Sequence, residues 1–135
     1  MATQLTAEAL WALIERPGNA AQAGTLHVLA TPIGNLGDLT LRAARIMDEV
    51  DTLYCEDTRV SAKLLAALNV RTTLVSLNEH NESARLGAVV EQLRAGQKIG
   101  LVSDAGTPLL SDPGARLVQA VIDAELPVTV VPGAS

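Results

Sequence analysis

Short aliphatic runs alternate with longer amphipathic stretches from residue 26 to the end of the chain. Strands of a parallel sheet that are buried on both faces appear in a sequence as continuous aliphatic runs. We therefore predict five strands. They are residues 26–31, 52–55, 73–77, 98–102 and 128–131.

Between these strands, hydrophobic positions recur at helical spacing. Val89 and Leu93 fall on one face of residues 82–95, and Gly96 then ends that helix, as Asn69 ends an earlier one. The predicted helices are residues 41–49, 61–68, 82–95 and 115–124. Strict alternation of strands and helices predicts an α/β fold, an open five-stranded parallel sheet with flanking helices and right-handed crossovers.

Residues 1–24 precede the alternating strands and helices. We expect residues 1–24 to form an N-terminal extension, in which Thr6 caps a short helix over residues 7–15. A Pro-Gly-Asn break follows, and residues 20–24 are typical of a linker. Residues 25–135 have the length of one domain.

Unusual residue types gather in the loops that follow the strands, whereas the opposite loops are plain turns. Ligands of an open parallel sheet bind beyond the carboxyl ends of its strands. We therefore expect the functional site at that rim. The loops concerned are residues 31–38, 56–59, 103–114 and 132–135.

The loop after the fourth strand carries the densest group of such residues. Gly106 allows a backbone to approach a ligand closely, two prolines stiffen the loop, and Asp104 supplies a carboxylate. A plain turn accounts for Asp112 as a helix cap and for Pro113 in the first helical position. It does not account for the remaining residues, so we favour a ligand-binding loop.

Two interpretations stay open for the segment from Glu56 to Arg59. In one, Asp57 or Thr58 caps the following helix and Arg59 forms a surface ion pair. In the other, the carboxylates of Glu56 and Asp57 contact a substrate or accept a proton at the rim. Cys55, at the end of the second strand, is more typical of a buried small hydrophobic residue than of a nucleophile.

Composition narrows the classes of function. The chain has one cysteine and a net charge of −5, so it contains no internal disulfide, no cysteine-cluster metal site and no strongly basic surface overall. His27 and His80 lie far apart, and we expect no metal site. No apolar run is long enough to span a bilayer and no signal peptide is evident, which favours a cytoplasmic location without membrane contact.

Several common motifs are missing. The first loop contains Gly34 and Gly37, but their spacing departs from the dinucleotide fingerprint and Pro32 occupies its first turn. A nicotinamide-dependent oxidoreductase is therefore a weak alternative. The chain also contains no phosphate-binding P-loop and no strand–serine–helix elbow of a hydrolase.

Taken together, the four rim loops resemble those of the tetrapyrrole-methylase superfamily of S-adenosylmethionine-dependent methyltransferases. The resemblance extends over about residues 26–135, and within the superfamily it is closest to bacterial enzymes that methylate a cytidine 2′-hydroxyl in 16S ribosomal RNA. The segments that carry it are Thr31-Pro32-Ile33-Gly34-Asn35-Leu36-Gly37-Asp38-Leu39-Thr40, Cys55-Glu56-Asp57-Thr58-Arg59, Ser103-Asp104-Ala105-Gly106-Thr107-Pro108, Ser111-Asp112-Pro113-Gly114 and Val131-Pro132-Gly133-Ala134-Ser135.

The resemblance implies a two-domain protein that binds S-adenosylmethionine between its domains. This chain then corresponds to the N-terminal domain, without the C-terminal one, and on its own we expect it to be inactive. The residues that the motifs assign to the cofactor are Pro32, Ile33, Asp104, Gly106, Thr107, Gly133 and Ser135.

The implied reaction transfers a methyl group to a ribose hydroxyl, which requires alignment of the hydroxyl and removal of its proton. We assign Glu56 or Asp57 to the substrate as the catalytic carboxylate, and Arg59 and Lys63 to RNA phosphates. The resemblance further implies a homodimer, the small ribosomal subunit or its 16S RNA as partner, and no metal. The alternatives are a tetrapyrrole methyltransferase of the corrin or sirohaem type and a non-catalytic nucleotide-binding module.

Overall fold

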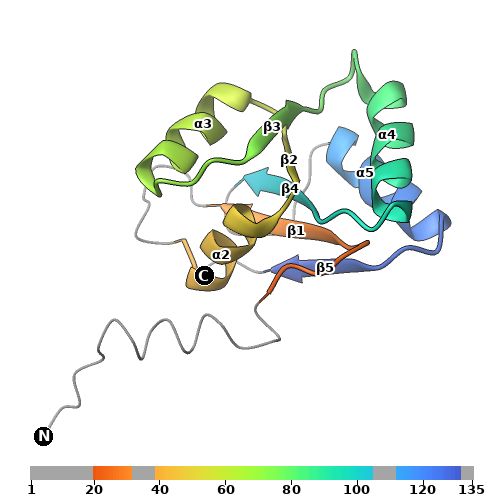
Figure 1. Ribbon diagram of the computed structural model, residues 1–135. Coiled ribbons are helices and arrows are strands. Elements are labelled where there is room, and N and C mark those ends of the chain that lie inside the picture. Colours follow the sequence, from red (N-terminus) through yellow and green to blue (C-terminus); the bar gives the residue numbers. More distant parts are fainter. Residues whose placement is uncertain (1–19, 32–38, 105–111, 132–135) are drawn as a thin grey trace, which may run out of the picture.

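Five parallel strands form one open sheet in the computed structural model, which describes residues 20–31, 39–104 and 112–131 (Figure 1). The strand order is β3-β2-β4-β1-β5, so β1 and β4 lie in the interior and β3 and β5 form the edges. The strands are β1 (Leu26–Thr31), β2 (Thr52–Cys55), β3 (Thr73–Ser76), β4 (Ile99–Asp104) and β5 (Val128–Val131). The predicted α/β fold with a five-stranded parallel sheet is confirmed.

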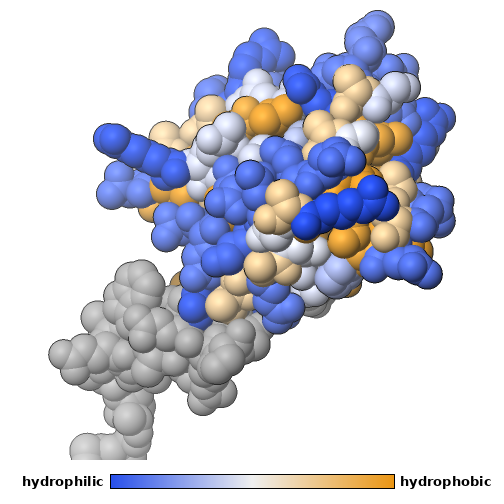
Figure 2. Space-filling model, turned by 45° about the vertical axis from the view of Figure 1, so that its right-hand side comes forward, coloured by the Kyte–Doolittle hydropathy of each residue, from blue (hydrophilic) through white to orange (hydrophobic). Residues whose placement is uncertain are grey.

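Four helices connect these strands, and two of them cover each face of the sheet. Helices α2 and α3 pack on the face that includes Leu29 and Leu53, whereas α4 and α5 pack on the face that includes Leu26 and Val28. The helices are α2 (Leu41–Glu49), α3 (Thr58–Ala67), α4 (Glu82–Arg94) and α5 (Asp112–Asp123). Figure 2 shows that the surface on the side of α4 is mostly hydrophilic, with apolar residues in separate patches.

Three predicted boundaries were wrong by two or three residues. Helix α3 begins at Thr58 rather than at residue 61, because the Asp57 side chain accepts a hydrogen bond from the Arg59 N–H and starts the helix there. Helix α5 begins at Asp112 rather than at residue 115. Strand β4 runs on to Asp104, two residues beyond its predicted end, because pairing with β1 continues that far.

The predicted helix ends are confirmed at two positions. Asn69 and Gly96 both have positive φ, 56° and 87°, which is the left-handed conformation that ends a helix. The predicted strand over residues 73–77 ends at Ser76, and the helix that precedes Gly96 ends at Arg94.

The segment before β1 contacts the domain instead of forming a free linker. Ala21 is buried against α2, and its N–H donates to a carboxylate oxygen of Glu49 at 2.9 Å. The Gln22 N–H donates to Nε2 of His27 at 3.0 Å. The helix that we predict over residues 7–15 lies outside the described residues.

His27 lies in β1, as expected, and is buried. Its Nδ1 lies 3.0 Å from the Ile99 carbonyl oxygen, while Nε2 accepts from Gln22. Nδ1 therefore carries the proton, and the ring is neutral. Burial is the main cause that lowers the pKa of His27 below its usual value. This histidine stabilises the sheet and the start of the domain.

Candidate functional site

The connections that follow β1 and β4 lead to opposite faces of the sheet, which makes the carboxyl ends of these strands a topological switch point, the place of the ligand crevice in open α/β sheets. The two strands are hydrogen-bonded neighbours, and their last residues, Thr31 and Asp104, lie opposite each other in the register. From Thr31 the chain leads to α2 on one face, and from Asp104 it leads to α5 on the other face. Such a switch point is where open α/β sheets bind their ligands.

Three of the four predicted rim loops begin at this crevice. Strand β5 pairs with β1 on its other side, and Leu29 lies opposite Val131 there. The loops after β4, β1 and β5 therefore leave three adjacent strands. Of the predicted cofactor residues, Asp104 is placed by its backbone at the end of β4. The others lie outside the described residues: Pro32, Ile33, Gly106, Thr107, Gly133 and Ser135.

The fourth loop joins β2 to α3, and its two acidic residues differ. Glu56 is exposed and lies directly after the strand. Asp57 is the N-cap of α3, and its carboxylate also pairs with the Arg59 guanidinium at 3.3 Å. These hydrogen bonds from Arg59 lower the pKa of the Asp57 carboxyl. The cap and the surface ion pair are therefore both present, which is the first of the two open interpretations.

The basic residues of this loop and helix are exposed. The Arg59 side chain is 88% exposed, and Lys63 follows one helical turn later on the same side of α3. A surface ion pair such as that of Arg59 contributes little to stability, so this side chain is free to exchange partners. Both residues are thus available at the start of α3, as their assignment to RNA phosphates requires.

Cys55 is buried, with an exposed fraction of 1%, and its thiol lies 4.0 Å from the Val75 carbonyl oxygen. The interpretation of this cysteine as a buried small residue is confirmed. Within the described ranges, no cluster of three or more histidine, cysteine or acidic side chains is arranged to hold a metal ion. None of the described helices is long and apolar enough to cross a membrane.

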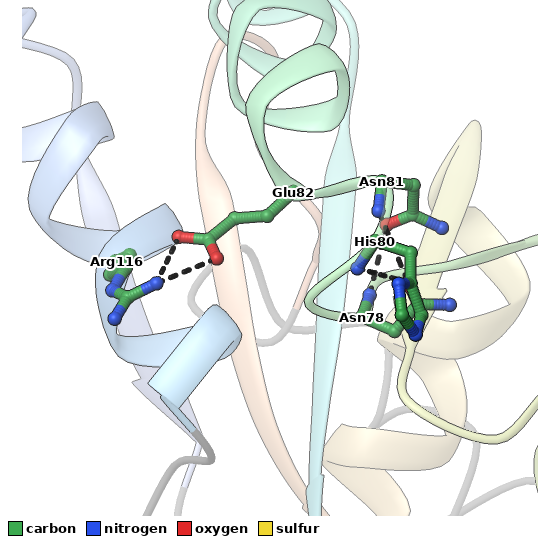
Figure 3. Close-up of polar contacts among 5 residues, drawn as sticks. All are labelled: Asn78, His80, Asn81, Glu82 and Arg116. Atoms are coloured by element: carbon green, nitrogen blue, oxygen red, sulfur yellow. Dashed lines mark hydrogen bonds and ion pairs between the residues drawn. The ribbon is translucent and has the colours of Figure 1, made fainter.

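A polar network in the loop between β3 and α4 was missed by the sequence analysis (Figure 3). The Asn78 carboxamide oxygen accepts from the N–H groups of His80 and Asn81, at 2.9 and 3.1 Å. The Asn81 side chain in turn accepts from the Asn78 N–H and donates to Ser76. The loop is therefore held by its own asparagines, and His80 is exposed, as expected for a loop residue.

The same loop is tied to the start of α5. Glu82 opens α4 and is buried, and both of its carboxylate oxygens accept from Nη1 of Arg116, at 3.1 and 2.8 Å (Figure 3). Arg116 belongs to the first turns of α5, which follows the predicted ligand loop after Asp104. No sequence signal joins the two residues, because 34 positions separate them.

A second residue that sequence analysis missed is Arg42, in the first turn of α2. Its Nε is buried and has no hydrogen-bond partner among the described residues. Leaving a buried donor without a partner costs about 1–3 kcal/mol. Arg42 lies in the helix that follows the predicted rim loop after β1.

Comparison with known proteins identifies the family of this chain. Residues 25–135 match the family model of tetrapyrrole (corrin/porphyrin) methylases. A protein of Micromonospora olivasterospora named ribosomal RNA small subunit methyltransferase I is 46% identical over 120 residues, which are 89% of this chain and 38% of that protein. Its namesake in Neisseria meningitidis serogroup B is 45% identical over 90% of this chain and 42% of its own length. The chain thus spans about two fifths of these relatives.

Solved structures agree on the fold. The uroporphyrin-III-C-methyltransferase of Thermus thermophilus superposes with a TM-score of 0.63 at 22% identity, over 83% of this chain and 48% of that one. At this identity the similarity concerns the fold alone. The parallel sheet, the switch point between β1 and β4 and the match over residues 25–135 agree, and the chain belongs to the tetrapyrrole (corrin/porphyrin) methylase family.

Proposed function

We propose that this chain is part of an S-adenosylmethionine-dependent enzyme that methylates the 2′-hydroxyl of a cytidine in 16S ribosomal RNA. One observation carries the proposal. Relatives named ribosomal RNA small subunit methyltransferase I are 45–46% identical to it over about nine tenths of its length, and the family match over residues 25–135 includes all four rim loops. The substrate is the small ribosomal subunit or its RNA, and the protein acts as a cytoplasmic homodimer.

The residue types at the crevice fit S-adenosylmethionine. Its sulfonium and ammonium groups are cationic, and the crevice begins at an aspartate, Asp104, at the end of an interior strand. The glycines Gly106 and Gly133 permit close approach of backbone donors to the cofactor. The cofactor supplies an activated methyl group, and the protein supplies binding and alignment. Pro32, Ile33, Thr107 and Ser135 complete our proposed cofactor set.

The two acidic residues after β2 are unequal as proton acceptors. Asp57 is engaged as the cap of α3 and by Arg59, which lowers the pKa of its carboxyl and makes it a weaker base. Glu56 is exposed, next to the end of β2. We therefore assign proton removal from the ribose hydroxyl to Glu56, and a positioning role, through Arg59, to Asp57. Arg59 and Lys63 contact RNA phosphates.

A binding experiment tests the cofactor assignment. S-adenosylmethionine is titrated calorimetrically into this chain and into a chimaera that continues with the remainder of the Micromonospora olivasterospora relative. Binding to the chimaera alone is expected, since the cofactor site is then shared between two domains. Tight binding to the 135-residue chain would contradict the two-domain site, and absence of binding to both would contradict the cofactor.

A transfer experiment tests the reaction. The chimaera is incubated with methyl-labelled S-adenosylmethionine and small ribosomal subunits, and the digested RNA is analysed for 2′-O-methylcytidine. Glu56→Gln is expected to lower kcat with cofactor binding unchanged, whereas the matched variant Asp57→Asn is expected to raise KM more than it lowers kcat. If neither variant changes turnover, the roles of these carboxylates are wrong. Label in a tetrapyrrole but not in RNA would overturn the RNA proposal.

A further inference from the structure

Charge is strongly segregated along this acidic chain. Residues 58–78 contain three basic side chains, Arg59, Lys63 and Arg71, and no acidic one, whereas the chain as a whole has a net charge of −5. These residues form α3, the turn after it and the edge strand β3. This stretch therefore carries net positive charge on one border of the sheet, where Figure 1 shows α3 beside β3, away from β5.

The outer side of α3 is exposed. Arg59, Val60 and Lys63 are all exposed, and Val60 is 62% exposed although it is apolar. Ala62 and Ala66 are exposed further along the helix. A helix surface with two cations, and without a carboxylate beyond its cap, is suited to the phosphates of an anionic polymer.

A shallow groove continues this surface at the far end of α3. It has a volume of about 420 Å³ and lies between α3 and the start of β3. Ala62 and Ala66 line it from the helix, and Arg71 and Leu74 line it from the chain around β3. The exposed side of α3 and the groove therefore form one continuous surface, with Arg71 at its end. Lys63 and Arg71 have no ion pair among the described residues.

We propose that a single strand of RNA lies along α3 and into this groove, with Arg59, Lys63 and Arg71 against its phosphates. The inference rests on the proposed function and extends it. Helix α3 starts at the catalytic rim and its ten residues span about 15 Å. RNA that reaches the rim with its target ribose thus has a positively charged path away from it, on the opposite side of β2 from the cofactor crevice.

Charge favours RNA over a second copy of the chain as the occupant. A self-complementary contact would bring these three cations of one copy against the same three of the other. The chain would need carboxylates within the patch to compensate, and residues 58–78 have none. Glu56 and Asp57 precede the helix, and Asp57 is bound to Arg59.

The test measures how RNA binding depends on salt. Fluorescence anisotropy follows the binding of a labelled single-stranded oligocytidine to this chain at several salt concentrations. For single strands the slope of log K against log salt falls by about 0.7 for each phosphate contact that is lost. We expect that loss in Arg71→Ala and in Lys63→Ala. Arg94→Ala is the matched control, because Arg94 is an exposed arginine in the last turn of α4, which packs on the other face of the sheet.

The control decides the outcome. Equal slopes for the Arg71→Ala and Arg94→Ala variants would overturn the proposal. A lower sedimentation coefficient of Arg71→Ala than of the parent chain would also overturn it, because Arg71 would then hold a second copy. All three positions are exposed, so the variants are expected to fold, and their far-ultraviolet circular dichroism checks this. If the chimaera fails to methylate RNA while the slope still responds to Arg71, the proposed reaction fails and this surface stands. If methylation succeeds and the slope does not respond, only the surface fails.

Discussion

Removing the Arg116 guanidinium should destabilise the domain through the carboxylate that it leaves behind. Nη1 of Arg116 donates to Glu82 at 2.8 and 3.1 Å. The Glu82 side chain is only 11% exposed, whereas that of Arg116 is 62% exposed. In Arg116→Ala, removal of the mostly exposed arginine side chain itself costs little free energy. The cost arises because the carboxylate of Glu82 remains largely buried without its partner.

The magnitude lies between two limits. Exposed ion pairs contribute about 0–1 kcal/mol, and breaking a buried pair by removing one partner costs about 3–5 kcal/mol. Because one partner is buried and the other is mostly exposed, we expect Arg116→Ala to lower the free energy of unfolding by about 1–2 kcal/mol. Glu82→Gln removes the charge but keeps an acceptor oxygen, so about 1 kcal/mol is expected.

A double-mutant cycle in urea separates the pair from its surroundings. The double variant should be about as stable as Glu82→Gln alone, because the uncharged glutamine no longer needs the arginine, which corresponds to a coupling energy of about 1–2 kcal/mol. Arg94→Ala, at the other end of α4, is the control and should change stability by less than about 0.5 kcal/mol. The urea concentrations at the midpoints of unfolding are compared for variants with the same m-value, the dependence of the unfolding free energy on urea.

Strict additivity of the two single variants would refute this reasoning, since independent sites do not share an ion pair. So would an Arg116→Ala variant as stable as the parent. A confirmed coupling would mean that the loop after β3 holds the start of α5, and with it the chain that leads from Asp104 into the cofactor loop.

Three further predictions concern the core. The pKa of His27 is lowered in the folded state, so below about pH 6.5 the unfolded chain binds more protons than the folded one. The free energy of unfolding should therefore fall as the pH decreases, which urea titrations over that range measure. A His27→Asn variant whose stability has the same dependence on pH would contradict this. A Cβ at Gly100 would lie 2.7 Å from Cδ1 of Leu53, so Gly100→Ala should cost about 1–3 kcal/mol in urea unfolding, and no loss would show that Leu53 moves freely. The Cys55 thiol should react with Ellman's reagent only after unfolding, and reaction at the rate of free cysteine would refute its burial.

The local features of this fold were readable from the sequence. Aliphatic runs located the five strands, and the position of Asn69 and Gly96 located two helix ends, because both depend on neighbouring residues alone. The start of α3 was predicted three residues late. The sequence of this short acidic segment is compatible with more than one role for Asp57, and only the structure shows that its side chain caps the helix. Loop motifs in the right order were also sufficient to predict the family.

Long-range relations were decided only by the tertiary structure. Hydrophobic periodicity says which residues are buried but not which strand lies beside which, so the order β3-β2-β4-β1-β5 and the meeting of Thr31 with Asp104 could not be read from it. The same holds for the pair of Glu82 and Arg116 and for the groove beside Arg71. By itself the sequence determined the elements, the residue types at the rim and the charge of α3. Packing of the helices on both faces of the sheet determined how these parts face one another, because that packing minimises exposed apolar surface over the whole chain at once.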